Sequence, residues 1–219
     1  MEQSKISAMM DGKTLTKENI RKMYQMVQSA SEAEEKKNVM KHSVFFVGQL
    51  PLKENHTVDL PQTERILHLS IPYEELDDCM EKLLEGLTTQ TLLLKKEDGS
   101  YEVNTKYEKS VLKVRKIARA YQAEMEKSLE EEMPKAKKMY QMGTKYYHDG
   151  DYPQAAACFM NAVELAEHRM AYYSLAMMYM EGKGVEKSLS EALFYVRHAV
   201  VKGAKIAEPL EREILAQLK

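Results

Sequence analysis

The sequence has little of several residue types that mark particular protein classes. Among its 219 residues there is no tryptophan, there are four phenylalanines, and there are two cysteines, Cys79 and Cys158. Two cysteines so far apart cannot form a disulfide framework, and their number fits a reducing compartment. No apolar run approaches the roughly 18–20 residues of a membrane-spanning helix, and residues 1–10 are too short and polar for a signal peptide. We therefore expect a cytoplasmic protein with no membrane partner.

An excess of charge of one sign is also missing. There are 32 Lys and Arg against 34 Asp and Glu, a formal net charge of −2. Dedicated nucleic-acid binders carry a clear basic excess, so the balance argues against a nucleic-acid partner. Residues 105–145 hold eleven Lys and Arg against six Glu, but these charges alternate with apolar positions. That alternation is typical of a solvated helix face.

Signatures of catalysis and of metal binding are absent from the sequence. The six histidines are scattered, with no His-x-x-x-His and no adjacent cysteine pair, so we expect no metal. There is no Gly-x-Ser-x-Gly motif, and Gly182-Lys183-Gly184 lacks the spacing of a phosphate-binding loop. Acidic residues at 74, 75, 77 and 78 fall at an expected helix start, where surface charges complement the helix dipole. We predict neither a catalytic site nor a cofactor.

Helical periodicity begins after residues 1–15, which show none and are predicted to form a mobile tail. From Thr16, apolar residues at 20, 23, 24 and 27 lie on one helix face. Ser31 and Glu34 have the spacing of a capping box for a second helix, which we expect Gly48 and Pro51 to end. Residues 48–62 lack periodicity and are predicted to be a loop.

Residues 64–104 predict a small strand–helix–hairpin unit. Residues 67–71 alternate in polarity like a strand, and Pro72 opens a helix with apolar positions at 76, 80, 83, 84 and 87. Asp98-Gly99 is a favoured two-residue hairpin turn within residues 91–103. The alternative is that the leucines at 92–94 extend the preceding helix. Residues 16–104 are therefore expected to form an α+β region.

Residues 105–133 contain neither proline nor glycine and predict one long connecting amphipathic helix. Its apolar positions are 107, 111, 114, 117, 118, 121, 125 and 129. Three consecutive glutamates, 130–132, and then Pro134 mark its end.

The last third of the chain repeats itself. One set of residues is Gly143, Tyr146, Ala155, Phe159 and Ala162, and a second is Ala176, Tyr179, Ala192, Val196 and Ala199. The first two members are offset by 33 positions and the last three by 37. Two helix–turn–helix units, the second with four extra residues in its turn, explain both offsets. The small residues allow paired helices to approach closely, and the aromatic residues fill the space between them.

These residues resemble known helical repeats. Ala136, Gly143, Tyr146, the Gly150-Asp-Tyr152 turn, Ala155, Phe159 and Ala162 look like a tetratricopeptide repeat. Residues 171–185, with the longer Gly182-x-Gly184 turn, followed by Ala192, Tyr195, Ala199 and Gly203, look like its Sel1-like relative. The resemblance covers residues 136–207, with Ala176 in place of the usual glycine and Val196 in place of an aromatic residue. Residues 1–133 resemble no family.

The resemblance implies a mainly α fold. We expect a superhelical stack of antiparallel helix pairs at residues 134–219, with residues 204–218 as a capping helix and the long helix at the other end. In such stacks the first helix of each repeat lines a concave groove. The residues expected to line it here are Lys137, Tyr140, Gln141, Thr144, Tyr147, Tyr173, Met177 and Met180.

Three functional hypotheses follow from the sequence. The favoured one is a non-enzymatic protein-interaction module or adaptor that binds a peptide or partner segment in this Tyr- and Met-lined groove. The second is a regulatory or assembly subunit in which the N-terminal region mediates docking or homodimerisation, so a homo-oligomer stays open. The third is an enzyme with a site within residues 48–104, which a pocket with converging titratable groups would support.

Overall fold

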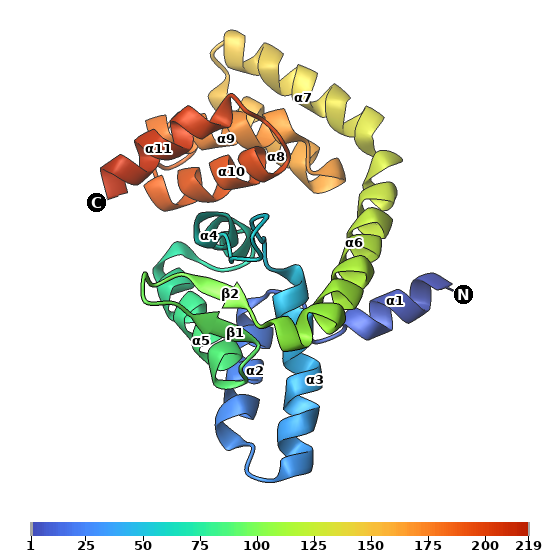
Figure 1. Ribbon diagram of the computed structural model, residues 1–219. Coiled ribbons are helices and arrows are strands. Elements are labelled where there is room, and N and C mark those ends of the chain that lie inside the picture. Colours follow the sequence, from blue (N-terminus) through green and yellow to red (C-terminus); the bar gives the residue numbers. More distant parts are fainter. Residues whose placement is uncertain (1, 219) are drawn as a thin grey trace. The chain divides into compact units, whose positions relative to one another are not determined.

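The computed structural model describes residues 2–218 and shows a mainly α protein with one small two-stranded sheet (Figure 1). The chain divides into two compact units, Met1–Glu124 (unit 1) and Met125–Lys219 (unit 2). The division falls inside one long helix, so that helix contributes to both units. Among the described residues, no helix combines the length and apolar character needed to cross a membrane.

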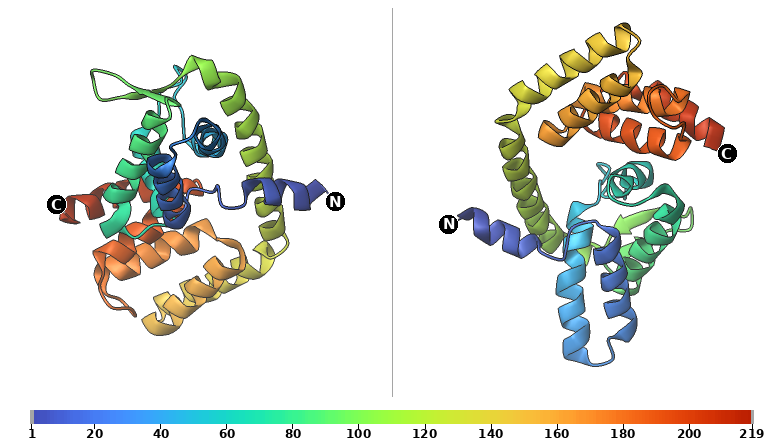
Figure 2. Two further views of the ribbon diagram at one scale, coloured as in Figure 1. Left: turned by 90° about the horizontal axis from the view of Figure 1, so that it is seen from below. Right: turned by 180° about the vertical axis from the view of Figure 1, so that it is seen from behind.

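Unit 1 contains five helices, two 3-10 turns, a hairpin and most of the long helix. Its elements are α1 (Glu2–Met10), α2 (Lys17–Ser29), α3 (Ala33–Gln49), α4 (Leu60–His68), η1 (Tyr73–Glu75), α5 (Leu76–Thr89), β1 (Leu93–Lys95), β2 (Tyr101–Val103), η2 (Thr105–Tyr107) and α6 (Glu108–Glu130). Figure 2 shows α2 and α3 running side by side, joined by a short turn. One cluster of buried side chains from α2, α3, α4, α5, β1, β2 and α6 and from the loops between them forms the core of the unit.

Two predictions at the start of the chain are wrong. The expected tail instead contains helix α1, and both Met10 and Leu15 are buried. The capping box of α3 is shifted by one residue, because Glu32 and Glu35 cap each other's backbone and Glu35 also accepts from Ser31. Helix α2 begins where the periodicity does, and the Thr16 side chain caps it by accepting a hydrogen bond from the Asn19 amide.

Gly48 does not end α3, contrary to the prediction. It lies within the helix and is buried, and a Cβ atom at this position would overlap the side chain of Val114 on α6. The absence of a side chain therefore allows α3 and α6 to approach closely. The helix ends one residue later, with Leu50 as its C-cap.

The strand expected at residues 67–71 is absent, and the segment begins as the end of helix α4. The side chain of Asp59 accepts a hydrogen bond from the Gln62 amide at 3.2 Å, and Pro61 occupies the first turn, where its missing N–H is tolerated. These signals lie in residues that the sequence assigns to a loop. The cap and the proline together favour a helix over an alternation of only five residues.

The predicted hairpin is confirmed, although its turn is longer than the two residues, Asp98 and Gly99, that were expected. β1 and β2 pair antiparallel with Lys95 opposite Tyr101. Lys96 then donates to the carbonyl of Ser100, and Gly99 donates to that of Lys96, which leaves a three-residue turn. Gly99 has a φ of 81° and is the only residue of the turn in the left-handed region. This geometry combines a tight turn with a glycine bulge, so Asp98 needs no positive φ.

Unit 2 begins with the last residues of α6 and consists of five further helices, α7 (Met133–His148), α8 (Tyr152–Ala166), α9 (Arg169–Glu181), α10 (Leu189–Val201) and α11 (Ala207–Leu218). α7 packs on α8, α8 on α9, α9 on α10, and α10 on α11. The last turns of α6 also contact the hydrophobic core of unit 2, through the partly buried side chain of Leu129. The helix pairing and the final covering helix agree with the expected mainly α fold.

The two helix pairs are built alike and differ in their turns. Three residues, 149–151, separate α7 from α8, whereas seven residues, 182–188, separate α9 from α10. The four extra residues are those inferred from the offsets of the repeat. The small residues lie between the helices as expected: Ala162, Ala176 and Ala199 are fully buried, and a Cβ at Gly143 would lie 2.7 Å from the Phe159 ring.

Candidate binding groove

A hollow of about 220 Å³ lies between the first helices of the two pairs in unit 2. We call it the groove. It is lined by Tyr140, Thr144 and Tyr147 of α7, Phe159 of α8, and Tyr173, Ser174 and Met177 of α9. Its lining is mostly aromatic and apolar, with the hydroxyl groups of tyrosine, serine and threonine as its polar atoms.

Five of the eight residues expected from the sequence line the groove together. They are Tyr140, Thr144, Tyr147, Tyr173 and Met177. Lys137 and Gln141 are exposed on α7, and Met180 is half-buried on α9; none of the three lines the hollow. Phe159 and Ser174 also line the groove and were not among the expected residues. Phe159 reaches the groove from the second helix because Gly143 leaves room for its ring.

Helical spacing explains how these side chains come together. Residues 140, 144 and 147 follow one another at intervals of four and three, which places them on one stripe of α7. Residues 173 and 177 do the same on α9. The buried small residues hold the helices close enough for the two stripes to face one hollow.

Tyr140 and Tyr147 of α7 line the groove and also pack against the core of unit 2. The Tyr140 ring lies 5.6 Å from Phe159 and 4.7 Å from the imidazole of His168, on which it stacks. The Tyr147 ring meets Tyr152 edge-on at 5.2 Å. Both tyrosines are partly buried against the core cluster. Their rings are therefore held in place before any ligand binds, which reduces the entropy lost on binding.

His168 marks one end of the groove. Its Nδ1 atom accepts a hydrogen bond from the Ala171 amide at 3.3 Å and so caps the start of α9. The pKa of His168 is lowered by burial and then by the nearby positive charges of Arg169 and Lys137. A lowered pKa favours the neutral imidazole, which is the form that can accept this hydrogen bond.

Lys183 marks the other end. Its Nζ atom donates to the Tyr147 hydroxyl at 3.4 Å and lies over the rings of Tyr147 and Tyr152 at 5.7 and 5.6 Å. It also pairs with Glu181 at 2.7 Å. The hydrogen bonds to Glu181 and to Tyr147 raise the pKa of Lys183 above its ordinary value. The longer second turn thus places a cation against the aromatic residues of the first pair.

A larger hollow, of about 510 Å³, lies in unit 1 between α5 and the hairpin. It falls in the region that the enzyme hypothesis assigned to a site. Its ionisable lining consists of Asp77, Glu81, Glu85, Lys95 and Tyr101, without a histidine or a cysteine. The other lining residues are Met80, Leu84, Thr88 and Thr89.

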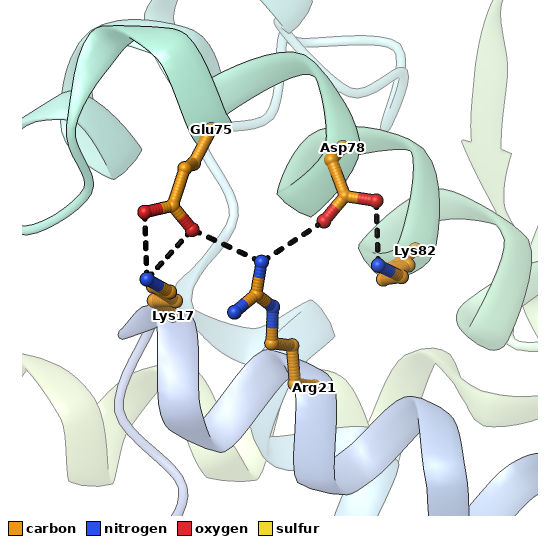
Figure 3. A network of polar contacts seen from close by, with 5 residues as sticks. All are labelled: Lys17, Arg21, Glu75, Asp78 and Lys82. Carbon is orange, nitrogen blue, oxygen red and sulfur yellow. Dashed lines mark hydrogen bonds and ion pairs between the residues drawn. The ribbon is translucent and has the colours of Figure 1, made fainter.

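The acidic cluster at the start of α5 is occupied by ion pairs (Figure 3). Glu75 binds Lys17 at 2.6 Å and Arg21 at 3.0 Å, both from α2, and Asp78 binds Arg21 at 3.3 Å and Lys82 at 2.5 Å. The hydrogen bond from Lys17 lowers the pKa of Glu75, and the one from Lys82 lowers that of Asp78. Both carboxylates are thus kept ionised, which suits surface charges joining two helices and not a proton donor.

Metal ligands and thiols are the remaining groups that could carry chemistry. Within residues 2–218, no three His, Cys, Asp or Glu side chains are grouped so that they could hold a metal ion. Cys79 and Cys158 are buried and unpaired, and burial raises the pKa of each thiol. A buried thiol with a raised pKa is a packing residue, as the sequence position of Cys158 indicates.

Comparison with known proteins gives one partial relative. The chain is 36% identical over 67 residues to the alginate biosynthesis protein AlgK of Azotobacter vinelandii, a protein of tetratricopeptide- and Sel1-like repeats. The match covers 31% of this chain and 15% of AlgK. No family model and no solved structure matches the chain. The similarity supports helical repeats in part of the chain.

Proposed function

We propose that this protein is a non-enzymatic interaction module that binds a segment of a partner protein in the groove of unit 2. The observation that carries the proposal is the preformed hollow of Tyr140, Thr144, Tyr147, Tyr173 and Met177 between two helix pairs. Tyrosine offers contact area with a polar tip, and methionine adapts its shape to different side chains. The cytoplasmic location belongs to the same proposal and rests on the two unpaired cysteines.

The size of the hollow favours a peptide over a small molecule. Pockets for cofactors and drug-sized ligands commonly enclose about 300–1,000 Å³. At about 220 Å³, the groove accommodates one large side chain or two small ones. A segment of a partner would place an anchoring side chain in the hollow and extend its backbone along α7 and α9.

Peptide selection tests the proposal without knowledge of the natural partner. A library of random twelve-residue peptides on phage is selected against the full chain, and the enriched peptides are synthesised with both ends capped. Their dissociation constants are then measured for the wild type, for Tyr173→Ala and for Met177→Ala. We expect each substitution to weaken binding about tenfold, since anchoring contacts contribute more than 1 kcal/mol.

Matched substitutions outside the groove serve as controls. Met142→Ala removes a methionine of α7 that is 39% exposed and does not line the hollow, and Tyr121→Ala removes a tyrosine of α6. Both should leave the dissociation constants within twofold of the wild type. Circular dichroism confirms that each variant is folded. Equal affinities for groove and control variants, or a failure to enrich any peptide, would contradict the proposal.

A further inference from the structure

The charges of unit 2 are divided between its helices. α7 carries Lys135, Lys137, Lys138 and Lys145 and no acidic residue, and α9 carries Arg169 and Glu181. The two groove helices thus hold five basic residues against one acidic residue. The other helices, α8, α10 and α11, hold two basic residues against five acidic residues, namely Arg197, Arg212, Glu164, Glu191, Glu208, Glu211 and Glu213.

This division does not follow from a basic composition. Residues 125–219 contain thirteen Lys and Arg against fourteen Asp and Glu, a formal net charge of −1. Positive charge is therefore concentrated on the helices that line the groove, within a unit that is slightly acidic. Such local concentration favours an oppositely charged partner at that surface.

Two of these cations lie at the His168 end of the groove. Lys137 is one turn before Tyr140 on the stripe of α7 that lines the groove, and Arg169 is one turn before Tyr173 on α9. Both act electrostatically on His168, whose ring stacks on Tyr140, so both lie near this end. Within residues 2–218 neither has a carboxylate partner at ion-pair distance, whereas the neighbouring Glu167 is paired with Lys202.

The distance between the two ends fits a short extended segment. Tyr147, which Lys183 contacts, lies ten positions after Lys137 on α7. At 1.5 Å per helical residue the separation is about 15 Å, and an extended peptide covers it with about four to five residues at 3.3 Å each. The hollow lies between these ends and accepts an apolar side chain.

We propose that the groove binds an extended acidic segment, with a Leu, Met or Phe side chain in the hollow and an Asp or Glu two or three residues away that pairs with Lys137 and Arg169. This inference rests on the proposed function, since it names the chemistry of the segment that the groove binds. At the opposite end of the groove, Lys183 would attract a second acidic group of the segment more weakly, because Lys183 is already paired with Glu181.

A single-stranded nucleic acid fits these observations less well. Binding along a strand uses one cation for each of several successive phosphates together with stacked bases. Here the two cations assigned to the groove, Lys137 and Arg169, lie at one end of it, and helices α8, α10 and α11 carry more acidic than basic residues. The hollow itself is apolar and accommodates one side chain.

The peptides selected on the full chain provide the probe. We expect them to be enriched in Asp and Glu on one side of a single apolar residue. The double substitution Lys137→Glu/Arg169→Glu should weaken binding of the tightest capped peptide at least tenfold, since it replaces two attractive contacts with repulsive ones. Lys138→Glu is the matched control, because Lys138 lies on α7 away from the groove stripe, and it should change binding less than twofold.

A charge exchange keeps the test independent of folding defects. A peptide with Lys in place of its acidic residues should bind the double variant at least tenfold more tightly than it binds the wild type. Acid-free peptides that need Tyr173 and Met177 but tolerate the charge reversal would overturn this inference and leave the proposed function intact. Peptides that ignore Tyr173 and Met177 would overturn the proposed function itself.

Nucleic acid is tested in the same assay. A fifteen-nucleotide oligothymidylate should not displace the labelled acidic peptide from the wild type at 150 mM salt. Displacement that is lost in the Lys137→Glu/Arg169→Glu variant would overturn the inference in favour of a nucleic-acid site.

Discussion

The helix pairs α7/α8 and α9/α10 share one packing plan but use their turns differently. In the first pair the turn only reverses the chain, and Gly150 has no neighbouring atom where a Cβ would lie. In the second pair the longer turn reaches back, so that Gly184 lies directly on the backbone of Tyr152 and Pro153. Lys183 contacts the Tyr147 and Tyr152 rings from the same turn. The four extra residues therefore join the second pair to the first.

The largest expected effect compares the glycines of these two turns. Gly184 and Gly150 both have positive φ, 71° and 82°. Gly184→Ala adds the left-handed strain and an overlap with the Tyr152 carbonyl, and we expect it to lower the free energy of unfolding by about 3 kcal/mol. Gly150→Ala adds the strain alone and should cost about 1 kcal/mol.

Urea denaturation of both glycine variants measures the difference. A loss that is equal in the two variants would show that the second turn does not pack on the first pair. A larger loss of unfolding free energy in Gly184→Ala than in Gly150→Ala would confirm that the contact of the second turn with Tyr152 and Pro153 stabilises unit 2.

A smaller effect is expected where the two pairs use different small residues. Gly143 of α7 corresponds to Ala176 of α9. A Cβ atom at Gly143 would lie 2.7 Å from the Phe159 ring, and the residue that corresponds to Phe159 in the second pair is Val196. Gly143→Ala should cost about 1–2 kcal/mol, because displacement of Phe159 outweighs the gain of about 1 kcal/mol in helix propensity.

A double-mutant cycle with Phe159→Leu isolates that contact. In the Phe159→Leu background, Gly143→Ala should be neutral or stabilising, since the ring that the methyl group meets is gone. If Gly143→Ala is equally destabilising in both backgrounds, the close approach of α7 and α8 is not what requires glycine at this position.

The smallest effect concerns the pH dependence of the cap on α9. The folded-state pKa of His168 is below 6.5, so the folded protein binds fewer protons at this site than the unfolded chain. Its contribution to stability is therefore complete above pH 6.5 and is lost as the pH falls through the folded-state pKa. His168→Asn keeps a capping oxygen that does not titrate.

Melting temperatures at pH 8 and pH 5.5 test this prediction. The wild type should lose more stability on acidification than His168→Asn, and the difference between the two proteins removes the contribution of the other titrating groups. An identical pH dependence would mean that the His168 imidazole does not cap α9 in solution.

The contrast between the units shows what sequence alone could predict. The helix pairs of unit 2 depend on small and aromatic residues at local, repeated spacings, so their pairing and the length of the second turn could be predicted. In unit 1 the alternation at residues 67–71 suggested a strand, because it fits a strand as well as a helix over so few positions. The residue that favours a helix here is the N-cap Asp59, and it lies within residues 48–62, which were predicted to be a loop. The reason for a glycine at position 48 is likewise its close contact with Val114, a residue that is distant in the sequence.

The candidate groove shows the same limit. Residues on the first-helix stripes could be predicted from spacing, and five of the eight line the hollow. Phe159 could not, because its access depends on how closely α8 approaches Gly143. Lys183 was assigned to a turn only, since its contact with Tyr147 requires the turn to fold back on the first pair.

The most direct test of the account is a map of the peptide's contacts by nuclear magnetic resonance. Backbone amide shifts of the full isotope-labelled chain are recorded as a selected capped peptide is added. We expect the largest shift changes in α7 and α9, around Tyr140, Tyr147, Tyr173 and Met177. Changes confined to unit 1, for example along α2 and α5, would contradict a binding site in the groove and support docking through the N-terminal region.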